Sequence, residues 1–82
     1  MEDLKEVRKR ITEIDNKMAE LFKARMEEVA KVAEYKKVNG LPVFDPEREE
    51  QVVANGANRI EDPQLKSYYG NFLKNLMDLS KD

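Results

Sequence analysis

Apolar side chains recur every three or four residues along most of the chain, which is the spacing of an α-helix. The first such stretch runs from Glu2 to Val38 and contains neither glycine nor proline. Its apolar positions are Leu4, Val7, Ile11, Ile14, Met18, Leu21, Phe22, Val29 and Val32. Asn39-Gly40, with Pro42 shortly beyond, signals the end of the helix. The pattern therefore predicts one helix of about 37 residues, roughly 55 Å long at about 1.5 Å per residue.

Two shorter helices follow, and each begins at an Asp-Pro pair. Asp45-Pro46 opens the second and Asp62-Pro63 the third, because aspartate caps a helix and proline fits its first position. The apolar side of the second helix carries Val52, Val53, Ala57 and Ile60, and that of the third carries Leu65, Tyr69, Phe72, Leu73, Leu76 and Leu79. Gly56 and Gly70 mark either close helix contacts or tolerated positions. The link 41–44 is too apolar for a flexible spacer, so we expect it to pack.

The first helix is too long for a compact single chain of this size. A globule of 82 residues has a radius of gyration of about 12 Å and a diameter of about 30 Å. A helix of roughly 55 Å overhangs such a globule, and its apolar stripe needs a second chain. A symmetric dimer is the simplest way to cover it. We therefore predict an all-α fold with one domain over residues 1–82, in which a long, a short and a medium helix assemble with those of a second copy.

The composition excludes several classes of function. The 15 basic and 17 acidic side chains are mixed along the chain, and no basic stripe with interleaved aromatics predicts a nucleic-acid partner. The sequence contains no cysteine and no histidine, which removes disulfides, thiolate metal sites and the commonest general base. No run approaches the roughly 20 apolar residues of a membrane span. The start, Met1-Glu2-Asp3, is acidic and lacks an apolar signal core, so we expect a cytosolic protein.

Two cations lie in the middle of the apolar stripe of the first helix. At about 100° per residue, Arg25 falls within about 20° of Met18, and Lys36 falls directly in line with it. Arg8 lies at the edge of the stripe. Burying an unpaired cation is costly, so each needs an anion, either a nearby acid such as Glu28 or a bound ligand. The alternative is that their aliphatic stems lie on apolar surface while the charged heads reach water.

Several convergent cations in a helical dimer indicate a pocket for a small polyanion. With Arg48 near the link, the set suits a dicarboxylate held by forked guanidinium contacts. Acidic residues crowd the start of the second helix, where carboxylates favour the helix dipole. We expect Asp45 and Glu47 to cap that helix, whereas Glu49 lies further in and can accept a hydroxyl from a ligand.

The order and spacing of these residues resemble the all-helical chorismate mutases. The resemblance covers almost the whole chain. It is carried by Val7-Arg8-Lys9-Arg10-Ile11, Ile14-Asp15, Arg25, Lys36 and Pro42-Val43-Phe44-Asp45-Pro46-Glu47-Arg48-Glu49. Its specificity lies in the intervals, which are 17 residues from Arg8 to Arg25, 11 from Arg25 to Lys36, and 12 from Lys36 to Arg48.

The resemblance implies an intertwined homodimeric helical bundle with two equivalent active sites. The implied reaction converts chorismate to prephenate, a step of phenylalanine and tyrosine biosynthesis, and it requires neither metal nor cofactor. In each site, Arg25, Lys36 and Arg48 would come from one chain and Arg8 from the other.

The resemblance also implies roles for individual residues. The substrate-binding set would be Arg8, Arg25, Lys36, Asp45, Arg48, Glu49 and Ser80, with Arg25, Lys36 and Glu49 as the catalytic members. Arg8, Arg25 and Lys36 would hold the two carboxylates, and Lys36 would also reach the ether oxygen. Arg48 and Ser80 would frame the carboxylate end. Glu49, with the backbone around Asp45, would hold the ring hydroxyl.

One position departs from the family pattern and leaves alternatives open. Family members usually carry a glutamine one helical turn after the serine, and that position, 84, falls beyond Asp82. The sequence is then either a domain of a longer fusion or an enzyme of impaired activity. Two other functions also fit the pattern. One is isochorismate pyruvate lyase, with the same fold and pocket. The other is a helical dimerisation or regulatory module, in which protein acids pair with the cations.

Overall fold

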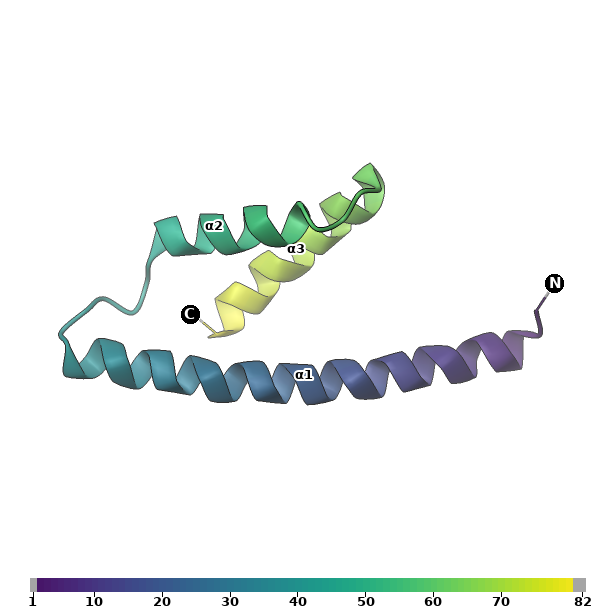
Figure 1. Ribbon diagram of the computed structural model, residues 1–82, viewed down its shortest axis with the longest axis horizontal. Helices are drawn as coiled ribbons and strands as arrows, with labels where there is room; N and C mark the ends of the chain where they lie inside the picture. The colour runs from purple at the N-terminus through teal and green to yellow at the C-terminus, as the bar shows by residue number, and fades with distance from the viewer. Residues whose placement is uncertain (1, 81–82) are drawn as a thin grey trace.

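The chain forms three α-helices in the computed structural model, which describes residues 2–80. They are α1 (Leu4–Val38), α2 (Pro46–Ala57) and α3 (Pro63–Ser80), and no strand occurs in that range. The predicted all-helical order of a long, a short and a medium helix is confirmed. Figure 1 shows α2 and α3 together on one side of α1, next to its C-terminal half.

Capping aspartates fix where the helices begin. The Asp45 carboxylate accepts from the Arg48 backbone N–H at 3.1 Å, and that of Asp62 accepts from the Gln64 N–H at 2.9 Å. Both predicted Asp-Pro starts are therefore confirmed. Asp3 caps α1 in the same way by accepting from the Lys5 N–H at 3.2 Å. Because a cap lies outside the helix, α1 begins two residues later than the predicted start at Glu2.

The end of α2 differs from the prediction. The helix ends at Ala57, so Ile60 lies in the turn before α3 and not on the apolar side of α2. The backbone N–H groups of Arg59 and Ile60 donate to Gly56 and Ala57, at 3.1 and 3.0 Å. These bonds span three residues instead of four, which tightens the chain into a turn and stops the helix.

The core of the single chain is small and lies between α2 and α3. Its buried hydrophobic side chains are Leu73 and Met77. Gly56 is also buried, and a Cβ at that position would overlap the Leu73 Cδ1, so this glycine allows α2 and α3 to approach closely. A Cβ at Gly70 would meet nothing within 4 Å. Gly56 therefore marks a close contact between helices, whereas Gly70 is a position at which glycine is merely tolerated.

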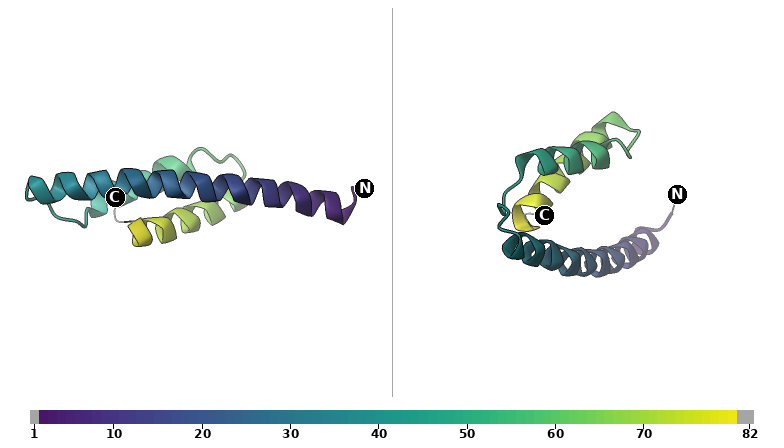
Figure 2. Two further views of the ribbon diagram at one scale, coloured as in Figure 1. Left: turned by 90° about the horizontal axis from the view of Figure 1, so that it is seen from below. Right: turned by 60° about the vertical axis from the view of Figure 1, so that its left-hand side comes forward.

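The long helix α1 contributes no buried residue within one chain. The molecule measures 56 × 26 × 16 Å with a radius of gyration of 16.1 Å, well above the roughly 12 Å of a compact chain of this length. The N-terminal end of α1 extends past α2 and α3, as two directions of view agree (Figures 1 and 2). The predicted overhang is therefore present. The expectation that the link packs is wrong for the single chain, because Leu41, Val43 and Phe44 stay exposed.

None of the helices within residues 2–80 combines the length and the apolar character that a bilayer crossing requires.

Candidate functional site

Arg25 is held by the last turns of α3. Its Nη1 donates to the Ser80 Oγ at 2.9 Å, and its Nη2 donates to the Met77 Sδ at 3.6 Å. The Ser80 hydroxyl in turn donates to the Leu76 carbonyl oxygen at 2.7 Å. Met77 is 2% exposed and Ser80 is 7% exposed, whereas Arg25 itself is half-buried. Two predicted site residues, Arg25 and Ser80, are thus in direct contact although 55 positions separate them.

Lys36, on the same face of α1, is held by the link to α2. Its Nζ donates to the Val43 backbone carbonyl at 3.0 Å, and the side chain is half-buried. The link turns back toward the helix because Gly40 adopts a φ of 65°, a conformation that side chains disfavour. The Leu41 N–H then donates to the Lys36 carbonyl at 2.8 Å and closes the end of α1. The turn and the contact together keep the ammonium group next to the link.

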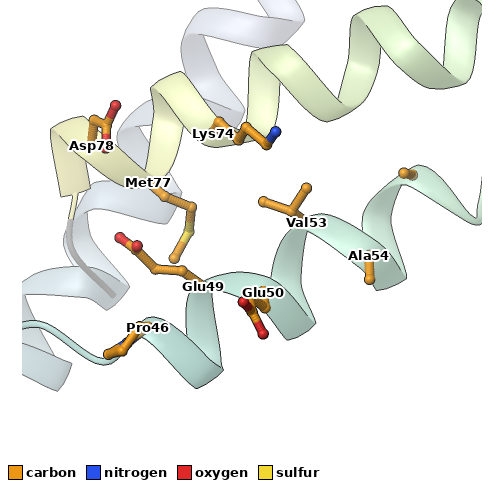
Figure 3. A pocket seen from close by; sticks show the side chains of 9 residues that line it. Pro46, Glu49, Glu50, Val53, Ala54, Lys74, Met77 and Asp78 are labelled. Carbon is orange, nitrogen blue, oxygen red and sulfur yellow. The ribbon is translucent and has the colours of Figure 1, made fainter.

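The start of α2 carries the acidic residues of the predicted site. The Asp45 carboxylate is engaged in the cap of α2, as predicted for it. Glu47 and Arg48 are exposed, whereas Glu49 is half-buried and its Oε1 atom is shielded from solvent. Figure 3 shows the Glu49 carboxylate pointing from α2 toward α3, beside the Met77 side chain. Glu49 and Met77 therefore meet between the two helices.

A groove of about 540 Å³ runs between α2 and α3 (Figure 3). It is lined by Pro46, Glu49, Glu50, Val53, Ala54, Ala57, Lys74, Met77 and Asp78. Neither Arg25 nor Lys36 lines it. The groove shares Glu49 and Met77 with the surroundings of the predicted cationic site, but it is not the dicarboxylate pocket predicted from the sequence.

A second, more apolar groove of about 290 Å³ lies between α1 and α3. Its lining consists of Met18, Leu21, Phe22, Arg25, Tyr69, Phe72 and Leu76. Arg25 is the only charged residue of this lining. The groove therefore runs from the apolar face of α1 to Arg25, which contacts Ser80 and Met77.

Arg8 does not join the other predicted residues within one chain. It is exposed in the first turns of α1, 17 residues from Arg25. That interval corresponds to about 25 Å along a straight helix at about 1.5 Å per residue. A single small molecule cannot contact both guanidinium groups of the same chain.

Glu28 pairs with Lys31 at 3.0 Å on the exposed side of α1. The sequence had suggested Glu28 as a counter-ion for the cations of the apolar stripe.

Within residues 2–80, no group of three or more acidic side chains is arranged to hold a metal ion.

Sequence reasoning missed Met77. The pattern correctly placed Leu73 on the apolar side of α3, but it added Leu76 and Leu79 where the structure buries Met77 and Ser80. The three buried residues follow each other at intervals of four and three residues, the spacing of one helix face. The spacing alone indicates this buried face, but the face was overlooked because it ends in a polar residue, Ser80.

Comparison with known proteins gives two relatives and one family. The sequence profile of the family described as chorismate mutase type II matches residues 7–82. A protein named chorismate mutase from Methanocaldococcus jannaschii is 46% identical over 52 residues, which are 63% of this chain and 52% of the relative. A protein named T-protein from Haemophilus influenzae is 43% identical over 49 residues, 60% of this chain and 13% of that protein. The chain thus spans about half the length of the first relative and a much smaller part of the second. No solved structure matches it significantly.

Proposed function

The chain belongs to the type II chorismate mutase family, and on that premise we propose that it rearranges chorismate to prephenate as a homodimer of single-domain chains. The observation that carries the proposal is the contact of Arg25 with Ser80 and Met77. This contact holds one cation at the apolar seam between α1 and α3, on the face of α1 that also carries Lys36.

The reaction suits a site without histidine or cysteine. In this pericyclic rearrangement one C–O bond breaks while one C–C bond forms, and no covalent enzyme intermediate arises. The protein has to hold the substrate in its reactive conformation and to stabilise the charge that develops. Fixed cations that bind both carboxylates keep the enolpyruvyl arm over the ring, which replaces a search through extended conformers.

The family resemblance suggests how the residues divide this work. Arg25 and Lys36 bind the carboxylates, and Lys36 also donates to the ether oxygen, where negative charge grows in the transition state. The buried position of the Glu49 Oε1 suits a carboxylate that accepts the ring hydroxyl, with the backbone near Asp45. Arg48 and Ser80 frame the carboxylate end, Ser80 through its contact with Arg25.

A second copy of the chain supplies Arg8 in this proposal. Two features support an intertwined dimer: α1 has no buried residue, and the groove between α1 and α3 is apolar and open. A partner's α1 lying along this face would cover both. It would also bring the partner's first turns, with their arginine, toward Arg25. This arrangement resolves the distance of about 25 Å that separates Arg8 from Arg25 within one chain.

Chorismate consumption tests the proposed reaction directly. The wild-type protein should accelerate the loss of chorismate absorbance, and Arg25→Ala should return it to nearly the spontaneous rate. Lys23→Ala is the matched control, because Lys23 is an exposed cation two residues away on the opposite face of α1. If chorismate absorbance falls only at the spontaneous rate in the presence of wild-type protein, the proposal is contradicted. Pyruvate released from isochorismate would instead indicate the lyase reaction.

The cytosolic location stays a prediction, for which cell fractionation is the test.

A further inference from the structure

We propose that Met77 and Ser80 are positioning residues that fix the Arg25 guanidinium before substrate binds. The inference rests on the proposed function, and it adds Met77 and gives Ser80 an indirect role. Both residues lie on the buried face of α3, and both contact terminal nitrogens of the same arginine.

The hydrogen bonds of Ser80 define what its hydroxyl can do. A serine hydroxyl has one proton to donate and lone pairs with which to accept. The Ser80 proton goes to the Leu76 carbonyl at 2.7 Å, and the oxygen accepts from the Arg25 Nη1 at 2.9 Å. In this arrangement the hydroxyl donates to Leu76 and serves the arginine as an acceptor. It acts on the anion through the arginine.

Met77 holds the other end of the guanidinium. Its sulfur accepts from the Arg25 Nη2 at 3.6 Å, and the side chain is 2% exposed, so the surrounding helices fix its position. A thioether is a weak acceptor, and the contact is correspondingly weaker than the one to Ser80. Together the two contacts engage both terminal nitrogens, which sets the plane of the fork as well as its location.

Fixing the plane matters for a forked cation. A guanidinium binds a carboxylate through two parallel N–H groups, so its orientation decides whether both bonds form. An arginine that already occupies one rotamer loses less conformational freedom when the anion arrives. We therefore expect the two α3 residues to affect turnover through the orientation that they give to Arg25.

The first arm of the test observes the Arg25 guanidinium without substrate, by NMR of protein labelled with ¹⁵N-arginine. The Arg25→Ala spectrum assigns the signals. In wild-type protein the two terminal nitrogens of Arg25 should give separate signals, because both are held. Ser80→Ala should merge them, and Ser80→Thr should keep them apart. Ser67→Ala is the matched control, since Ser67 is an exposed serine earlier in α3. Merged signals in wild-type protein, or unchanged signals in Ser80→Ala, would overturn the inference.

The second arm measures kcat and KM for chorismate. Ser80→Ala should lower kcat/KM about tenfold or more, the effect of one hydrogen bond to a charged group. Met77→Leu, which keeps the volume but removes the acceptor, should lower it by a smaller factor. If Ser80→Ala retains the kcat/KM of Ser67→Ala, the positioning role is refuted while the enzyme assignment stands. If wild-type protein shows no turnover, the proposed function fails, and the NMR arm still decides whether the arginine is held.

Discussion

Arg25 and Lys36 lie on one face of α1, yet each is held by a different part of the chain. Arg25 is oriented by the end of α3, and Lys36 by the carbonyl of Val43 in the link. Neither contact is local to the helix that carries the cation. The contacts of Arg25 therefore form once α3 has packed against α1, whereas the contact of Lys36 needs the turn that follows α1.

At the residue scale, Lys36→Gln tests the stabilisation of the ether oxygen. The substitution removes the charge and retains much of the stem. Loss of one such donor costs about 3–4 kcal/mol in the transition state, so kcat/KM should fall by about two to three orders of magnitude. Steady-state kinetics beside Lys37→Gln, an exposed neighbour, provide the comparison. Equal kcat/KM values for the two variants would remove Lys36 from the mechanism.

The sequence predicted the cations but not the contacts that orient them. Helical periodicity is a property of neighbouring residues, so it sufficed to place Arg25 and Lys36 on the apolar stripe. The partners Met77 and Ser80 lie more than 50 positions away in the chain. Which face of α3 reaches α1 depends on how α3 packs against α2, and the local pattern favoured the more apolar neighbours Leu76 and Leu79.

At the scale of helices, features that depend on neighbouring residues were again predictable, and features that depend on distant residues were not. The starts of α2 and α3 were predictable because capping by Asp45 and Asp62 involves residues within one turn. The end of α2 was not, because the apolar spacing continues through Ile60 while the backbone already turns. The close approach of α2 and α3 at Gly56 depends on a leucine of the other helix, so the sequence left it open.

Gly56→Ala and Gly70→Ala form a matched pair that tests this packing. A Cβ at position 56 overlaps the end of the Leu73 side chain, and overpacking typically costs about 1–3 kcal/mol, so it cancels or exceeds the helix-propensity gain of about 1 kcal/mol. At position 70 the space is open, so alanine should stabilise the fold by up to about 1 kcal/mol. Urea unfolding at one fixed protein concentration measures both. A Gly56→Ala protein as stable as Gly70→Ala would contradict the close contact.

At the scale of the whole molecule, the chain is extended, and the 35-residue helix α1 has no buried residue. The overhang was predictable, since helix length and domain size follow from residue number alone. A second copy as the chain that covers the stripe was predicted in the same way, and it stays a prediction, because one chain shows no partner. The exposed apolar stripe and the remote Arg8 both favour a second copy.

Met18→Glu tests that dimer. Met18 is 51% exposed in one chain and lies at the centre of the stripe, so a partner helix would bury the new carboxylate at high cost. Wild-type protein should sediment as a dimer, and the Met18→Glu protein should be monomeric or unfolded. Lys23→Glu, which introduces the same charge on the opposite face, should remain dimeric. A folded wild-type monomer at micromolar concentration would exclude the arrangement.

The most direct test of the account mixes two inactive variants. Arg8→Ala and Arg25→Ala each damage both sites of their own homodimer. When subunits exchange, a mixed dimer should contain one site with both arginines intact and one site that lacks both. Random pairing makes half of the dimers mixed, so chorismate turnover should recover to about one quarter of the wild-type level. If the mixture stays as inactive as its components after subunit exchange, the two arginines do not form a shared site across chains.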